Sequence, residues 1–169
     1  NDIALIVSDV MCSAAGVYTS NKVKGAPVIV TKKNLEKSGG RAKAVIVNSK
    51  NANTCNANGI EIAEQTSALL AAELGIAAED VVVASTGVIG QPMCIDPIAS
   101  GIPALVKGLS ADGSKNAAEG IMTTDTALKE IAVEFEVDGV SCRIGGIAKG
   151  SGMINPNMAT MLSFITSDV

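Results

Sequence analysis

The fold class is decided by the stretch Ile131-Ala-Val-Glu-Phe-Glu-Val-Asp-Gly-Val-Ser-Cys-Arg-Ile144, in which apolar residues alternate with polar or small ones. Asp138-Gly139 interrupts the alternation, and this pair favours a two-residue hairpin turn. Because successive side chains of a strand point to opposite faces, the apolar positions share one face. The stretch therefore predicts a β-hairpin with one buried face and one face in water.

Four other short apolar runs have the length and composition of buried strands. They are Ile3–Val7, Ala26–Thr31, Ala44–Asn48 and Val81–Ala84. The polar segment Lys32–Lys43 contains Gly39-Gly40 and is predicted to be a surface turn. The Asn-rich segment 48–58 is predicted to be a structured loop, because asparagine tolerates the left-handed backbone conformation. Both a plain loop and a loop that lines a site fit this composition.

Helical periodicity is clearest over Gly59–Leu74, where apolar residues recur on one face and Gly75 provides a stop. A second helix is predicted to start at Asp96 with Pro97 in its first turn, and a short third helix over Asn116–Met122. Ser85–Gly90 reads as a glycine-containing turn after a strand. Strands and helices are mixed along one compact length, which predicts an α/β or α+β domain.

Composition limits the function classes. The 169 residues are 47% apolar and 18% charged, which fits one domain with a substantial core. The net charge of −4 and the small number of aromatic residues argue against binding to nucleic acid. No apolar run approaches the length of a membrane span, so we expect no membrane partner and a cytoplasmic protein.

The sequence contains no histidine, which excludes Ser-His-Asp and Cys-His catalysis within this chain. Its four cysteines include no C-x-x-C pair, so we expect no metal site. A hydroxyl nucleophile would then need another base, such as its own α-amino group freed by chain cleavage. Thr160 is a candidate, because small Ala159 precedes it and an apolar run follows.

The glycine-rich segment before Thr160 has two further interpretations. It could be a purely structural turn after the hairpin. It could also suggest a phosphate cradle, but the P-loop spacing is absent and Lys149 precedes Gly150-Ser-Gly152 rather than following it.

Five blocks of sequence, in this order, resemble the ornithine acetyltransferase (glutamate N-acetyltransferase, ArgJ) family of arginine biosynthesis. They are Asp2–Val10, Ala14–Thr19, Ala84–Gly90, Met122–Thr126 and Lys149–Leu162. The last block contains Met-Ala-Thr-Met-Leu, which is similar to the family's self-cleavage motif. The resemblance covers essentially the whole chain.

The resemblance implies a fold and a cleavage site. The fold would be a layered αββα sandwich of the self-processing, N-terminal-nucleophile type that is also found in DmpA-like aminopeptidases. The precursor would cut itself between Ala159 and Thr160. Residues 1–169 would then form a single domain that contains most of an α-chain (1–159) and the first residues of a β-chain (160–169), as part of a longer precursor.

The resemblance also implies an activity. Thr160 would take an acetyl group from N-acetylornithine and pass it to glutamate. Thr86 and Gly87 match the family's oxyanion hole, and Thr123 and Lys149 match its substrate-binding residues. We expect no bound cofactor, with acetyl-CoA a candidate co-substrate in a bifunctional enzyme. The expected partners are the protein's own β-chain and an α2β2 assembly, in the cytoplasm, or in the mitochondrion if the source is a fungus.

One position departs from the family pattern, and two alternative functions stay open. Lys50 stands where members more often carry glycine, so no role is assigned to the Asn-rich loop. A self-processing aminopeptidase or amidohydrolase on the same scaffold would pass the acyl group to water, although such enzymes mostly use serine. A ligand-binding domain without enzymatic activity would stay uncut.

Overall fold

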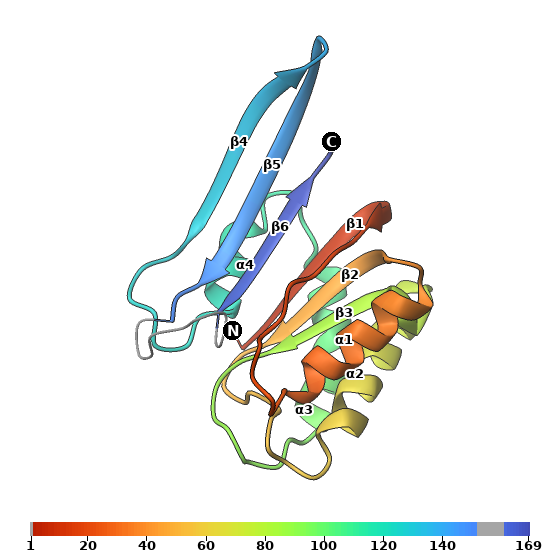
Figure 1. The fold of residues 1–169 in the computed structure, drawn as a ribbon, viewed down its shortest axis with the longest axis vertical. Coiled ribbons are helices and arrows are strands. Elements are labelled where there is room, and N and C mark those ends of the chain that lie inside the picture. The colour runs from red at the N-terminus through yellow and green to blue at the C-terminus, as the bar shows by residue number, and fades with distance from the viewer. Residues whose placement is uncertain (1, 152–160) are drawn as a thin grey trace.

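The structure is a computed structural model, and it describes residues 2–151 and 161–169. Two three-stranded sheets form its centre (Figure 1). The first sheet has the order β1 (Ile3–Ser13), β2 (Arg41–Asn48) and β3 (Val81–Ser85). β1 runs antiparallel to β2, and β2 runs parallel to β3. The helix α2 (Gly59–Leu74) lies in the connection between these two parallel strands.

The second sheet is antiparallel throughout and has the order β4 (Glu130–Val137), β5 (Val140–Lys149) and β6 (Leu162–Ser167). β5 and β6 pair in register from Ile144 opposite Ser167 to Lys149 opposite Leu162. This pairing brings the two ends of the β5–β6 connection, Lys149 and Leu162, together at one end of the sheet.

The helices α1 (Ala26–Lys37), α2 and α3 (Asp96–Lys107) cover the outer face of the first sheet (Figure 1). Their aliphatic side chains form one core with β2 and β3, centred on Val30, Leu70 and Val81. The inner face of the first sheet packs on the second sheet in another core, together with the short helix α4 (Ser114–Gly120). A 3-10 turn, η1 (Ala78–Asp80), precedes β3. The layers are therefore helix, sheet and sheet, as in an αββα sandwich, and the mixed α/β fold class is confirmed.

The predicted helix Gly59–Leu74 is confirmed, and Gly75 ends it in the left-handed conformation at φ 66°. The predicted helix from Asp96 is also confirmed, with Pro97 in its first turn. The short third helix lies at Ser114–Gly120, two residues before the predicted range. The strands predicted at the N-terminus, at Ala44–Asn48 and at Val81–Ala84 are present as β1, β2 and β3.

The strand predicted for Ala26–Thr31 is wrong, because this run begins helix α1. Pro27 fits the first turn of a helix, and the buried positions recur at helical spacing. Thr31 contributes to the packing, since its hydroxyl donates to the Val83 carbonyl at 2.7 Å and accepts from the Val83 N–H at 2.9 Å. The surface turn predicted for Lys32–Lys43 is correspondingly wrong: the helix continues to Lys37, and β2 begins at Arg41.

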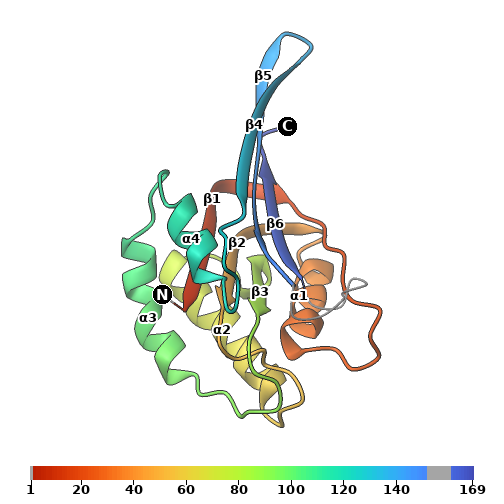
Figure 2. The same ribbon diagram turned by 90° about the vertical axis from the view of Figure 1, so that its left-hand side faces the viewer.

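The β4–β5 hairpin is confirmed, and both turn residues have positive φ, 51° at Asp138 and 82° at Gly139. The burial predicted for its apolar face is wrong, since Ile131 is 72% exposed. The opposite face packs inward instead, through Ile147 on β5. We call the exposed apolar side the outer face of the second sheet. Its members are Ile131, Val133, Val137, Val140, Ile144 and Ile165. Figure 2 shows the tip of the hairpin standing clear of the helices.

Candidate active site

The sequence-predicted site residues follow strand ends that meet at one end of the molecule. β3 and β5 both end there, and β6 begins there (Figure 1). Ala84 near the end of β3 and Ile147 near the end of β5 contact the same core between the sheets. Side chains two positions apart in an extended chain point to the same side. Thr86 therefore lies on the same side as Ala84, and Lys149 lies on the same side as Ile147. The end of β3 and the end of β5 are therefore brought to one region.

The Thr86–Gly87 turn is held by backbone hydrogen bonds on both sides. The Thr86 N–H donates to the Asn48 carbonyl at 3.0 Å, and the Val88 N–H donates to the Lys50 carbonyl at 2.9 Å. Among the described residues, no group accepts a hydrogen bond from the Gly87 N–H or the Thr86 hydroxyl. Within the part of the chain that the structure describes, the turn therefore offers two donors without an acceptor, which is the requirement for stabilising an oxyanion.

Gly87 is required at this turn for two geometric reasons. Its φ of 132° lies in a region that side-chain-bearing residues rarely adopt. A Cβ atom there would lie 2.1 Å from the Lys50 carbonyl carbon and 2.3 Å from the Lys50 carbonyl oxygen. The Asn-rich loop and the turn are therefore in direct backbone contact.

This contact gives the Asn-rich loop a function that the sequence did not reveal. The Asn48 side chain accepts from the Ser85 hydroxyl and donates to the Asn51 carbonyl at 2.8 Å. Further along, the Ala52 N–H donates to the Val88 carbonyl, and the Gly90 N–H donates to Thr54, both at 2.9 Å. Through these hydrogen bonds the loop supports the Thr86–Gly87 turn.

Lys50 lies in this support at φ 80°, in the left-handed region that glycine adopts without strain. We expect Lys50→Gly to raise the free energy of unfolding by about 1 kcal/mol, because relief of the left-handed backbone outweighs the added freedom of the unfolded chain. Lys50→Ala is the matched control, since it also removes the exposed ion pair with Asp2 but keeps the strain. Urea denaturation of both variants measures the difference, and equal stabilities would contradict the prediction.

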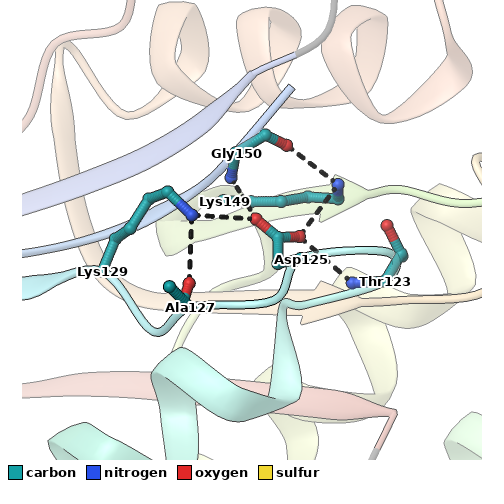
Figure 3. A network of polar contacts seen from close by, with 6 residues as sticks. All are labelled: Thr123, Asp125, Ala127, Lys129, Lys149 and Gly150. Carbon is teal, nitrogen blue, oxygen red and sulfur yellow. Dashed lines mark hydrogen bonds and ion pairs between the residues drawn. The ribbon is translucent and has the colours of Figure 1, made fainter. Parts of the chain in front are cut away.

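Lys149 and Thr123 meet at the carboxylate of Asp125 (Figure 3). The Lys149 ammonium lies 3.4 Å from Asp125 Oδ2, and the Thr123 N–H donates to the same oxygen at 3.4 Å. Lys149 is only 7% exposed, whereas Thr123 is at the surface. The two residues predicted to bind substrate are therefore neighbours on one anchoring group.

Asp125 is the residue that sequence reasoning missed. Burial alone would raise the pKa of its carboxyl, but two backbone N–H donors and two ammonium groups outweigh burial and hold that pKa below its ordinary value. The carboxylate is therefore charged at neutral pH. The only sequence signal was its position inside the Met122–Thr126 block, since nothing in the pattern indicated which lysines it contacts.

The predicted cleavage site, Ala159 and Thr160, lies outside the described residues. The strands on each side of it are described, and they place Lys149 opposite Leu162 in the β5–β6 pairing. Leu162 follows Thr160 by two positions in the sequence. Among the described residues, Thr86 and Gly87 form no hydrogen bond to Thr123 or Lys149, so the site consists of two separate groups at one end of the sheets.

The model of the ArgJ family matches residues 1–169, and the chain belongs to that family. The "arginine biosynthesis bifunctional protein ArgJ" of Symbiobacterium thermophilum is 51% identical over 168 residues, and that of Staphylococcus aureus strain Mu50 is 49% identical over 169. Each match covers 99% of this chain. The chain spans 41% and 40% of the length of these two curated relatives.

Two solved structures have the same fold. The crystal structure of "arginine biosynthesis bifunctional protein argJ" from Bacillus halodurans superposes with a TM-score of 0.84 at 39% identity. The ornithine acetyltransferase of Mycobacterium tuberculosis, solved in complex with ornithine, gives 0.78 at 33% identity. Each covers 95% of this chain, which covers 83% and 84% of those chains. Among the described residues, no helix combines the length and apolar character needed to cross a membrane.

Proposed function

We propose that the complete protein is a glutamate N-acetyltransferase that moves an acetyl group from N-acetylornithine to glutamate through an acetyl-Thr160 intermediate. One observation carries the proposal: in a chain that matches the ArgJ family over its whole length, the Thr86–Gly87 turn follows β3, buried Lys149 ends β5, and these two strands end at the same end of the sheets. The strand that follows Thr160 in the sequence starts at that end as well.

The proposed chemistry begins with self-cleavage. The Thr160 hydroxyl attacks the Ala159 carbonyl, the peptide bond to the Thr160 nitrogen breaks, and water hydrolyses the resulting ester. The freed α-amine then serves as base for the same hydroxyl. In the first transfer, the hydroxyl attacks the acetyl carbonyl and ornithine leaves with the proton. In the second, the glutamate amine attacks the acetyl ester and regenerates the threonine.

The described residues have matching functions in this scheme. The Gly87 N–H and the Thr86 hydroxyl would donate to the oxyanion in each acyl step. The Lys149 ammonium would pair with the substrate carboxylate beside Thr123, in a site with little water to compete. In this scheme the base is the threonine amine, and none of the 169 residues of this chain is a histidine that would compete for that role.

The lengths of the relatives support a protein made of two chains. This chain covers most of each solved chain but about two fifths of the curated proteins, so the solved chains are about half as long as those proteins. In the proposal, residues 1–159 belong to the α-chain, and residues 160–169 begin the β-chain. The rest of the β-chain covers the outer face of the second sheet, where Ile131 and Ile165 are each 72% exposed. The expected assembly is α2β2.

The proposed location is the cytoplasm. All four cysteines carry free thiols, which suits a reducing compartment, and the relatives reported above are bacterial. Acetyl-CoA is proposed as a co-substrate rather than a bound cofactor, and the relatives' name "bifunctional" supports a second activity.

The test is to incubate the purified full-length protein with N-acetylornithine, with and without glutamate. Acetylglutamate formed only with glutamate supports transfer, whereas free acetate without glutamate would indicate an amidohydrolase. A third sample with acetyl-CoA and glutamate reports on the second donor. A denaturing gel shows whether the chain is cut, and one uncut band with no product would favour a non-enzymatic ligand-binding domain.

Lys149→Ala in the full-length protein should raise KM for both amino-acid substrates more than it lowers kcat. The lost charge-assisted contact is worth about 1.5–3 kcal/mol of binding. Arg143→Ala is the matched control, because it removes an exposed cation from the same strand, where Arg143 pairs with Glu134. An unchanged KM for N-acetylornithine and glutamate would rule Lys149 out as the carboxylate-binding residue.

A further inference from the structure

The Asp125 carboxylate is fully engaged by its surroundings. Oδ1 accepts from the Gly150 N–H at 2.6 Å and from the Lys129 ammonium at 3.3 Å. Oδ2 accepts from the Thr123 N–H and from the Lys149 ammonium. The side chain is only 3% exposed (Figure 3). A buried carboxylate with four donors connects the segment after α4 to the end of β5.

The two lysines at this carboxylate have different environments. The Lys149 side chain is 8% exposed, and its ammonium also donates to the Gly150 carbonyl at 3.1 Å. The Lys129 side chain is 46% exposed and also donates to the Ala127 carbonyl at 3.0 Å. A buried ammonium needs a counter-charge, whereas an exposed one is stabilised by water. Asp125 is therefore more important to Lys149 than to Lys129.

Gly150 makes this arrangement possible. A Cβ atom on residue 150 would lie 2.7 Å from Asp125 Oδ1 and 3.0 Å from the Lys129 ammonium. Only a residue without a side chain lets the carboxylate reach the backbone N–H at the end of β5. This explains the first glycine of the Lys149-Gly-Ser-Gly motif by close approach and not by backbone strain.

The local charges are unbalanced by one unit. Two ammonium groups face one carboxylate, so one further anionic group would make the cluster neutral. In the proposed function that anionic group is the substrate carboxylate. It would pair with the Lys149 ammonium, because Lys149 is the buried one of the two lysines. The Oδ2 atom of Asp125 is shared by Lys149 and Thr123, which fixes both relative to one point.

We propose that Asp125 is a positioning residue, whose carboxylate holds the Lys149 ammonium next to Thr123 in the orientation that receives the substrate carboxylate. This inference rests on the proposed function and deepens it. Asp125 itself does not touch the reacting atoms. It acts through Lys149, so its loss should matter only as long as Lys149 is present.

A double-mutant cycle on the full-length protein tests this dependence. Asp125→Asn keeps the shape of the side chain but removes its charge, and Lys149→Met removes the ammonium. We expect each single variant to raise KM for N-acetylornithine and glutamate on the order of tenfold, with a smaller fall in kcat. The double variant should have a KM within about twofold of Lys149→Met alone. Lys33→Met is the matched control, because it removes an exposed ammonium that pairs with Glu64 outside this cluster, and it should leave KM within about twofold of wild type.

Gly150→Ala provides a second route if Asp125→Asn folds poorly. It keeps every charge but displaces the carboxylate, so it should also raise KM severalfold in protein that a gel shows to be cut. Multiplicative KM effects in the double variant, or a wild-type KM in folded Asp125→Asn, would overturn the inference while wild-type transfer keeps the proposed function intact. A wild type that neither binds nor acetylates glutamate would overturn both.

Discussion

Full-length protein that carries Thr160→Ala should remain a single uncut chain and transfer no acetyl group. The hydroxyl that would attack the Ala159 carbonyl is missing, and no free amine forms at residue 160. Intact-mass measurement of wild type and variant decides the first point, and acetylglutamate formation decides the second. Thr160→Ser keeps a hydroxyl and should retain slow processing.

The control for this experiment is Thr166→Ala, which removes an exposed hydroxyl from β6 and should leave cleavage and transfer unchanged. Because the Thr160 α-amine is the proposed base, the rate of acetyl transfer should depend on pH. An α-amine has an ordinary pKa of about 7.7–8.0, so activity should fall as the pH drops and the amine takes up a proton. Cleavage before residue 160 in Thr160→Ala, or full activity of uncut wild type, would refute the mechanism.

Gly87→Ala should reduce kcat by about 10²–10³-fold, the usual effect of losing one oxyanion donor. The added methyl group would overlap the Lys50 backbone, so the turn must shift and its N–H must lose the required direction. The effect should be local, since the loop and turn lie at one end of the first sheet. Initial rates at saturating substrate measure kcat, and thermal melting by circular dichroism reports on the fold.

Two further variants distinguish the loss of a correctly directed N–H donor at Gly87 from a general loss of stability. Gly39→Ala places a side chain at φ 67° in open space, far from the turn, and so shows the general effect of a left-handed alanine. Thr86→Val removes the hydroxyl donor while keeping a β-branched shape, and should lower kcat in a protein of nearly normal stability. Near-normal turnover in folded Gly87→Ala would show that the turn is only structural.

Sequence patterns predict an element of this fold correctly where residues close together in the chain determine its structure. Helix Gly59–Leu74 has its own apolar face and its own glycine stop, and it was predicted with its bounds. A strand is predicted for Ala26–Thr31 because β-branched residues favour strands, but this preference is weak and tertiary packing overrides it here. There the burial of Val30 and the pair of hydrogen bonds between Thr31 and Val83 stabilise a helix.

The hairpin shows that a sequence pattern does not predict which face of a sheet is buried. Alternation in the sequence states which positions share a face, and the pairing of Val133 with Ile144 agrees. It does not state what covers that face. The second sheet packs on the first through Ile147 on the opposite side, which leaves the more apolar side exposed in this chain.

The site was predicted unevenly for a similar reason. Thr86, Gly87, Thr123 and Lys149 could be named because the resemblance carries them residue by residue. Lys50 and Asp125 make their contacts across the fold: the Lys50 backbone lies against the Thr86–Gly87 turn, and the Asp125 carboxylate joins two lysines. Such contacts leave no periodicity in the sequence.

The pairing of β5 with β6 has a consequence for the cut protein. After cleavage at Ala159–Thr160 the two strands would belong to different polypeptides, yet they would share one hydrogen-bonded ladder from Ile144–Ser167 to Lys149–Leu162. The pieces would therefore gain almost no translational entropy, and they would dissociate only on unfolding. The new amine terminus would remain tethered at a high effective concentration beside the Lys149 end of β5. Cleavage would thus produce a complemented split protein whose reactive residue precedes β6 by two positions in the sequence.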